Sequence, residues 1–350
     1  MKWWQQACQK PNNLTRQQAI QHQLQLTKPA GALGELENIA IQLAALQATV
    51  QPHVDQIWIC IYAADHGVVA ENISAYPQQV TRQMLSNFAH GGACIAVMAR
   101  QYQAHLEVID CGIVGAAVDI TGVKRCAVAS GTANFTQQAA MNIAQCEQAL
   151  SIGYDSVERA IQAGSDLYVA GEMGIGNTCA ATALAGLLLK HPAAVLTGPG
   201  TGLNADTLQH KIAVIERAIA LHAPRVGQDA LQILAAVGGF EIAAMVGAYI
   251  RCAQRGLAVV VDGFISTVAA LIAVHLNSAV RPWLIFAHQS AEPGHALVLE
   301  ALNAHVLLKL NLRLGEASGA GAALGLIRLA CLLHQQMATF SRAEVDQSLQ

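Results

Sequence analysis

The segment LRLGEASGAGAALGL (312–326) places one carboxylate, Glu316, among small and apolar residues. The glycines around it allow close backbone approach, and desolvation beside an apolar helix should raise the pKa of Glu316 toward the range of a general base. A second interpretation remains open. As a first-turn residue of a helix, Glu316 would be favoured by the helix dipole, which lowers the pKa instead. The two interpretations predict shifts of opposite sign.

Three more segments have the composition of anion-binding loops. GEMGIGNT (171–178) follows an apolar run and opens an apolar helix, where backbone N–H groups and the helix dipole collect an anion. It lacks the P-loop lysine and the third glycine of the dinucleotide fingerprint. A tight turn under close helix packing is the alternative, although a turn needs no carboxylate and Glu172 supplies one. HQSAEPGH (288–295) ends another apolar run and carries Ser290, Glu292 and Gly294.

The third of these segments is TGPGTGLN (197–204), which precedes a polar helix that carries Lys211. A glycine-rich turn near a lysine can hold a phosphate. A lone lysine on a helix is equally well explained as a solvated surface charge. The sequence leaves both interpretations of Lys211 open.

Metal binding and covalent catalysis have weak support. His66, His288 and His295, with Asp65, suggest metal ligands, but the chain has no His pair at i, i+4 and no HExxH. We therefore expect no metal site. We expect these histidines to make hydrogen bonds. No GxSxG elbow is present, and none of the nine cysteines stands in an evident basic setting, so a Ser or Cys nucleophile is not expected.

Charge is scarce in this chain. Of 350 residues, 12% are charged and 53% are hydrophobic, and the net charge is −3, against about 25% charged residues in a typical soluble domain. Lys and Arg form no cluster, so nucleic acid is not an expected partner. The most apolar segment, 256–274, is divided by Asp262 and Gly263 into a strand and a helix, so no membrane span is expected. Wide alanine-rich faces predict burial on a sheet or in a subunit interface, hence an oligomer.

The first residues, MKWWQQACQKPNNLTRQQ, turn polar within four positions and contain no apolar h-region, so no export signal is expected. The cysteines show no CxxC and no pairing rhythm, which is typical of reduced thiols. The predicted compartment is the cytosol.

A strand–loop–helix pattern recurs along the chain. Its five apolar runs begin the segments 57–69, 105–114, 166–189, 257–274 and 283–303. The first is followed by one long helical segment, 80–102. This alternation predicts an α/β fold with a mostly parallel, Rossmann-like sheet in three layers. The polar loops must then lie at the carboxyl ends of the strands, where such sheets bind ligands.

The two ends of the chain do not fit this pattern. Residues 1–25 are rich in Gln and helical in pattern, and residues 325–350 also read as helix. We predict that 1–25 and 325–350 pack together as a small helical domain, and that 26–324 form a large α/β catalytic domain.

Taken together, eight ordered motifs resemble the nicotinate-nucleotide:dimethylbenzimidazole phosphoribosyltransferase family of the cobalamin lower-ligand pathway. They are LTKPAGALGELE, AADHGVVAENISAYPQQVT, GEMGIGNTCAATAL, GPGTGLN, VGGFEIAAMVGAYI, VVDGFISTVAAL, HQSAEPGH and LRLGEASGAGAAL. They cover residues from about 26 to 330. Eight motifs in order are far more specific than any single loop.

The resemblance implies an α/β sheet domain with a small helical domain, in a homodimer. It implies transfer of the 5-phosphoribosyl group of nicotinate mononucleotide to 5,6-dimethylbenzimidazole, giving α-ribazole 5'-phosphate and nicotinate without a metal or other cofactor. By motif position, Glu316 matches the general base and Glu172 a second carboxylate of the site. Residues matched to phosphate and ribose are Gly174, Gly176, Asn177, Gly200, Thr201, Gly202, Lys211, Gly263, Ser290 and Gly315; those matched to the base are Tyr76, Met84 and Met173.

Two departures from the family pattern concern the first motif and the base slot. Ala30 and Ala32 stand where the family usually has Pro and Ser, at the entry to a helix rather than in the site. Base-slot positions vary in the family, so the accepted base stays open. The competing hypothesis is a non-catalytic nucleotide-binding or sensing protein, which would need the anion loops but neither glutamate. A dehydrogenase is disfavoured because the loops lack a dinucleotide fingerprint.

Overall fold

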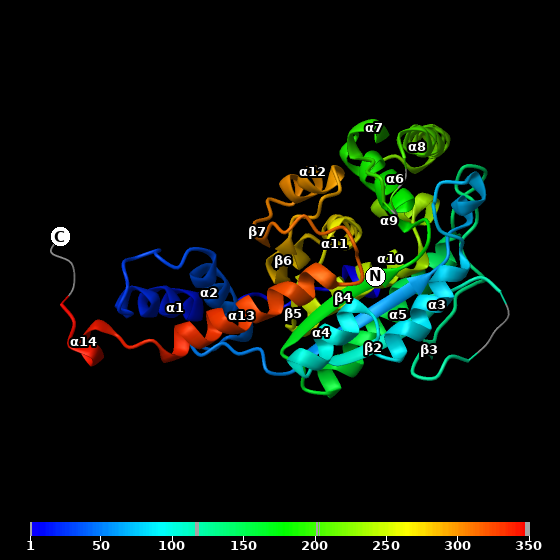
Figure 1. The fold of residues 1–350 in the computed structure, drawn as a ribbon. Coiled ribbons are helices and arrows are strands. Elements are labelled where there is room, and N and C mark those ends of the chain that lie inside the picture. The colour runs from blue at the N-terminus through cyan, green and yellow to red at the C-terminus, as the bar shows by residue number, and fades with distance from the viewer. Residues whose placement is uncertain (1, 116–118, 201, 203, 347–350) are drawn as a thin grey trace.

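Seven parallel strands form one sheet in the computed structural model, which describes residues 2–115, 119–200, 202 and 204–346 (Figure 1). The strands are β1 (Ile57–Ala64), β2 (His105–Gly112), β3 (Lys124–Arg125), β4 (Leu167–Met173), β5 (Ala258–Val261), β6 (Leu284–His288) and β7 (Val306–Leu308). Their order across the sheet is β3-β2-β1-β4-β5-β6-β7. The predicted α/β class with a parallel sheet is confirmed.

Helices cover both faces of the sheet. On one face α3 (Gln79–Ala89) and α4 (Cys94–Tyr102) pack on β1 and β2, and α13 (Ser318–Gln336) packs on β6 and β7. On the other, α10 (Phe240–Arg255) and α11 (Phe264–Leu276) contact β4 and β5, and α5 (Ile143–Gln162) packs on α10. Every residue of β1 and β4 is buried, as strands between two helical layers require.

Further helices lie outside these two layers. They are α6 (Asn177–Leu189), α7 (Ala193–Leu196), α8 (Ala205–Val226), α9 (Ala230–Val237), α12 (Gly294–Ala301) and α14 (Phe340–Ala343), with 3-10 helices η1 (Trp3–Gln5), η2 (Gly67–Glu71) and η3 (Ser278–Trp283). α6 contacts α7, α8, α9 and α12 and also α11, so it joins these four helices to the layer formed by α10 and α11. None of the helices in the described part of the chain has both the length and the apolar character that a membrane crossing needs.

Two features of the sequence-based expectation were wrong in detail. The single helix expected over 80–102 is two helices, because the chain turns at Gly91, whose φ of +83° favours glycine. Strands β3 and β7 were not predicted; each has only two or three residues, too few for a periodic signal.

The helices near the two ends of the chain extend to one side of the sheet (Figure 1). α1 (Asn13–Gln25) packs on α2 (Glu35–Gln47), which also packs on α13. α2 lies within the range expected for the large domain, whereas the first residues pack elsewhere: η1 contacts α10, and Trp283 Nε1 donates to Gln9 O at 3.0 Å. The division of the chain at residues 25 and 325 stays a prediction.

Candidate active site

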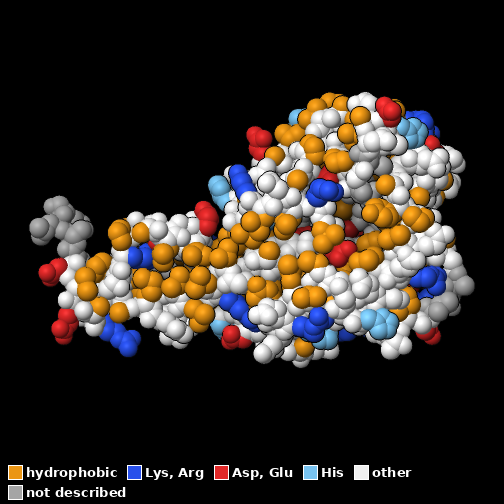
Figure 2. Space-filling model, in the orientation of Figure 1, with side chains coloured by type: hydrophobic (Ala, Val, Ile, Leu, Met, Phe, Trp, Pro, Cys, Tyr) orange, Lys and Arg blue, Asp and Glu red, His pale blue; other side chains and the backbone are white. Residues whose placement is uncertain are grey.

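A cavity of about 460 Å³ opens at the carboxyl ends of β4, β5 and β6. Acidic side chains lie inside the hollow and hydrophobic side chains surround it (Figure 2). The predicted site residues that line the cavity are Tyr76, Met84, Glu172, Met173, Gly174, Asn177, Gly200, Gly263, Ser290, Gly315 and Glu316. The sheet therefore brings together residues that are up to 240 positions apart in the sequence, as the parallel topology requires.

Glu172 and Glu316 lie next to each other in this cavity. Glu172 belongs to β4, and Glu316 precedes the N-cap of α13. The backbone N–H of Glu316 lies 3.4 Å from Glu172 Oε1, and Asn177 Nδ2 donates to Glu172 Oε2. A Cβ at residue 315 would lie 2.5 Å from Glu172 Oε1, so the close approach requires Gly315. Within the described part of the chain, no group donates a hydrogen bond to the Glu316 carboxylate, which leaves it available to a ligand.

Burial governs the protonation of both carboxyl groups. The side chains of Glu172 and Glu316 are buried, and burial raises the pKa of Glu316 to about 7, with the negative charge of Asp262 as the second cause. Burial also raises the pKa of Glu172 to about 8, and the carboxylates of Asp262 and Glu241 add to the shift. The interpretation of Glu316 as a first-turn helix charge with a lowered pKa is wrong, because α13 begins two residues later and burial raises the pKa of this carboxyl group.

The predicted anion loops meet at one part of the cavity wall. Gly174 and Asn177 line it where α6 begins, and the N-terminus of α6 has no side-chain cap. Gly200 lies beside them, with a φ of +52°. A Cβ there would lie 3.0 Å from Lys211 Nζ, so the lysine stands directly behind Gly200.

Lys211 is not the surface charge that one interpretation expected. It is only 2% exposed, and its Nζ donates to Thr178 Oγ1 at 2.9 Å. Burial lowers the pKa of Lys211, although the charge of Glu292 opposes the shift. Lys211, Gly176 and Gly202 are not among the described residues that line the cavity, and Thr201 lies outside the described residues.

Ser290 is held by a buried histidine. The backbone N–H of Ser290 donates to His295 Nδ1 at 2.9 Å, and burial lowers the pKa of His295 to about 3. The ring is therefore neutral, and these hydrogen bonds assign its proton to Nε2, 2.9 Å from Thr267 Oγ1. Thr267 in turn donates to Gly263 O at 2.8 Å. This chain of bonds ties the loop after β6 to the loop after β5.

Asp262 and Arg313 line the cavity but had no predicted role in the site. Asp262 follows the last residue of β5, the position where a parallel sheet presents its ligand-binding groups, so its place in the sequence could have identified it. Arg313 offered no such signal. It lies in an irregular segment whose path depends on the short strand β7, and its positive charge acts on Glu292.

Apolar side chains form another part of the wall. Tyr76, Met84 and Met173 line the cavity as predicted, together with Val80 and Leu314. Tyr76 is 53% exposed and Leu314 57%, so both stand at the opening, whereas Met173 is buried. A flat aromatic ring can lie between such groups through stacking and sulfur–aromatic contacts.

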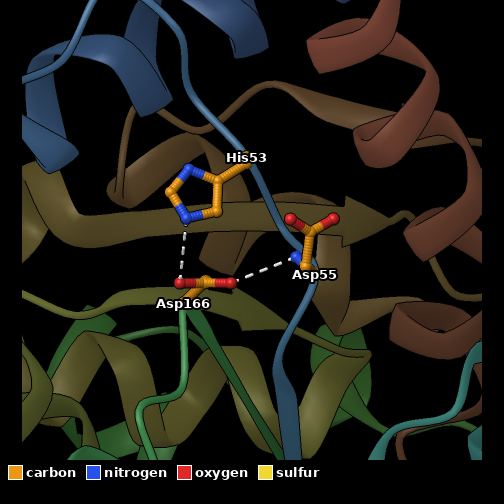
Figure 3. A group of neighbouring side chains, drawn as sticks. All are labelled: His53, Asp55 and Asp166. Carbon is orange, nitrogen blue, oxygen red and sulfur yellow. Dashed lines mark hydrogen bonds and ion pairs between the residues drawn. The ribbon is translucent and has the colours of Figure 1, made fainter.

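The histidines that suggested metal ligands lie close to carboxylates or hydroxyl groups. His66 Nε2 lies 2.6 Å from Glu241 Oε1, with both side chains fully buried, and His288 Nε2 lies 3.7 Å from Asp262 Oδ1. Among the described residues, one group of three could hold a metal ion: His53, Asp55 and Asp166 (Figure 3).

The group in Figure 3 lies at the amino ends of β1 and β4, opposite the cavity. Asp166 Oδ1 lies 3.3 Å from His53 Nε2, and its Oδ2 accepts from the backbone N–H groups of Asp55 at 3.1 Å and Gln56 at 2.9 Å. These bonds explain the group as a structural tie between the starts of two paired strands.

The raised pKa of Glu316 has a consequence for stability. Between pH 4.5, the ordinary value, and about 7, the unfolded chain loses the proton while the folded chain keeps it, so stability falls as pH rises. Glu316→Gln removes the loss of stability that comes from ionising a buried carboxyl group. The variant should match the wild type near pH 4 and exceed its free energy of unfolding by about 1 to 3 kcal/mol at pH 8.5, measured by urea unfolding.

The exposed Glu300 of α12 provides the control, because Glu300→Gln changes a solvated side chain and should give no gap that depends on pH. A Glu316→Gln variant less stable than wild type at both pH values would contradict the burial argument.

Comparisons with known proteins show the family of this chain. A family model described as phosphoribosyltransferase matches residues 8–345. The nicotinate-nucleotide–dimethylbenzimidazole phosphoribosyltransferase of Pseudomonas putida (strain F1) is 58% identical over 343 residues, 98% of this chain and 97% of the relative. The corresponding protein of Pseudomonas aeruginosa (strain LESB58) is 54% identical over 346 residues, 99% of this chain and 98% of the relative.

Solved structures give the same result. The crystal structure of CobT from Thermus thermophilus matches with a TM-score of 0.91 at 44% identity, covering 96% of this chain and all of that one. A second structure from that organism, described as the dimethylbenzimidazole phosphoribosyltransferase, matches with a TM-score of 0.90 at 42% identity over the same shares. The chain belongs to the nicotinate-nucleotide–dimethylbenzimidazole phosphoribosyltransferase family.

Proposed function

We propose that the protein transfers the 5-phosphoribosyl group of nicotinate mononucleotide to 5,6-dimethylbenzimidazole, giving α-ribazole 5'-phosphate and nicotinate for cobalamin synthesis. The observation that carries the proposal is the Glu316 carboxyl, buried in a cavity beside apolar side chains and with a pKa near 7. A base with such a pKa is half ionised at neutral pH, where it can take up a proton. Relatives at up to 58% identity carry the name of this activity.

The chemistry requires one base and no acid. The leaving nicotinate is already a quaternary pyridinium, so its ring nitrogen departs neutral and needs no proton. One nitrogen of the imidazole ring attacks C1' with its lone pair, and the other ring nitrogen loses its N–H proton, which Glu316 accepts in this proposal. Attack on the face opposite the leaving group inverts C1', which converts a β-nucleotide into an α-product.

Charge in the cavity matches the charge of the substrate. The pyridinium and the developing positive charge on the ribose would lie near Glu172 and Asp262, the acidic part of the wall. A nearby cation lowers the pKa of a carboxyl group, so substrate binding should favour the ionised form of Glu172. The phosphate would lie at another part of the cavity wall, where the N-terminus of α6, Ser290 and Arg313 meet and Lys211 lies behind Gly200.

The acceptor base is proposed to lie against Tyr76, Met84 and Met173. Flat apolar bicyclic bases suit such a slot, and the flexibility of methionine should make it permissive. Adenine should react more slowly, because its extra polar edges would be buried without partners.

A second copy of the chain is the proposed partner. Exposed hydrophobic residues form a band from the cavity along α13 to α1 (Figure 2). Exposed hydrophobic residues on or next to these helices include Leu14 at 69% exposure, Leu314 at 57% and Leu332 at 47%. A homodimer would cover this band. The cytosol is the proposed compartment, which nine free cysteines support, because thiols stay reduced there.

Turnover tests the proposed reaction directly. Wild-type protein, incubated with nicotinate mononucleotide and dimethylbenzimidazole, should release nicotinate and α-ribazole 5'-phosphate, followed by chromatography. Nicotinate riboside, which lacks the phosphate, should be a very poor substrate. Glu316→Gln should lower kcat by roughly 100-fold to 10,000-fold, the range for losing a positioned base, while nucleotide binding is retained.

Glu300→Gln is again the control and should keep wild-type turnover. Nucleotide binding by wild type without any product would favour the non-catalytic binding protein. Near-normal kcat in Glu316→Gln would reject the assignment of Glu316 as the general base but not the proposed reaction.

Sedimentation velocity tests the homodimer. The wild type should sediment with the mass of two chains, and Leu329→Glu combined with Leu332→Glu, which places two charges on the exposed face of α13, should shift it toward one chain. A monomeric wild type at micromolar concentration would refute the proposed dimer.

A further inference from the structure

The start of α13 adopts an unusual backbone. Gly315, Glu316 and Ala317 have φ values of +83°, +59° and +60°, so two residues with side chains stand in the left-handed region. The N-cap residue, Ala317, has no side chain that could accept from the first N–H groups of the helix. A strained segment of this kind persists only where its surroundings fix it.

Asp262 supplies the missing cap from another loop. Its Oδ1 accepts from the backbone N–H of Ala320 at 2.8 Å, and the N–H groups of Gly319 and Gly263 also donate to this carboxylate. Asp262 is 2% exposed and follows the last residue of β5. One carboxylate thus joins the start of α13 to the central sheet, immediately after Glu316.

Side chains pack tightly around this junction between Asp262 and α13. A Cβ at residue 319 would lie 2.0 Å from His288 Cδ2, so the imidazole of His288 lies directly against the helix start. His288 Nε2 lies 3.7 Å from Asp262 Oδ1. Asp262 is therefore held between β6 and α13, and it lines the same cavity as Glu316.

We propose that Asp262 is a positioning residue for Glu316: it caps α13 from outside the helix and places its carboxylate beside that of Glu316. This inference rests on the proposed function, since it concerns the base of that reaction. It predicts that a substitution can keep the helix cap that Asp262 provides and remove only its negative charge.

The titratable and charged groups around Glu316 come from several elements. They are Glu172 on β4, Asp262 after β5, His288 on β6, Cys94 on α4 and Arg313 in the segment after β7. After burial, Asp262 is the charge that raises the pKa of Glu316, and it is also the largest charge effect on the pKa of Glu172. Burial raises the pKa of Asp262 itself, and the backbone N–H groups of Ala320, Gly263 and Gly319 oppose that shift because they favour the ionised carboxylate. Removing the negative charge of this carboxylate should lower the pKa of Glu316.

Asp262→Asn separates the two roles. The amide oxygen can still accept from Ala320 N–H, but the negative charge is gone. Activity requires ionised Glu316, so kcat/KM falls at pH values below its pKa, which lies near 7 in the wild type. In Asp262→Asn the acid limb of the kcat/KM profile should move down by about one pH unit, with the melting temperature little changed. Asp262→Ala, which removes cap and charge together, should lower both kcat and the melting temperature.

Two further variants complete the design. Asp229 is the N-cap residue of α9, accepts from Leu231 N–H at 2.9 Å and is exposed, so Asp229→Asn also makes a helix-capping aspartate neutral. It is the control variant and should leave the acid limb unmoved. Asp262→Ser offers a second neutral acceptor and should shift the limb as Asp262→Asn does.

An unmoved acid limb in Asp262→Asn and Asp262→Ser, with active wild type, would overturn the role of Asp262 while leaving the proposed function intact. Failure of both neutral variants to fold, with Asp229→Asn folded, would also overturn it, because a neutral acceptor should suffice as the cap. Absence of turnover in the wild type would instead reject the proposed function itself.

Discussion

The repulsion and desolvation of three carboxylates in one cavity set the character of this site. Glu172, Asp262 and Glu316 are each less than a tenth exposed, and an ionised carboxylate away from water is costly unless it is hydrogen-bonded or paired. Asp262 has three backbone N–H donors and Glu172 has two donors, whereas Glu316 has none among the described residues. Glu316 has the fewest hydrogen-bond donors of the three, so its carboxyl group is the one free to exchange a proton with a ligand.

The sheet explains why such a cluster can exist. β4 and β5 are neighbours, so the end of one presents Glu172 beside Asp262 at the end of the other. The chain then returns through β7, and Gly315 allows Glu316 to approach Glu172 where any side chain would collide. A cationic pyridinium nucleotide fits this arrangement, because its positive charge would relieve the repulsion that the fold maintains in the free protein.

The sequence predicted the elements that carry a strong local signal. The runs that became β1, β2, β4, β5 and β6 are long or continuous enough to identify, and most loops at their ends line the cavity. The features that the sequence could not predict depend on contacts between residues far apart in the chain. The burial of Lys211 comes from the packing of α8 on α6, and the capping of α13 by Asp262 joins residues 58 positions apart. The sign of the pKa shift at Glu316 stayed open for the same reason.

A titration of the glutamate side-chain carboxyls in the free protein, followed by NMR with ¹³C-labelled glutamate, tests the central claim most directly. Glu316→Gln and Glu172→Gln would each remove one signal and so assign it. We expect the signal of Glu316 to titrate near pH 7 and that of Glu172 near pH 8, well above the ordinary range of glutamate. Titration of both signals below about pH 5 would contradict this expectation, because two solvated or well-paired carboxylates would leave the cavity without a base suited to neutral pH.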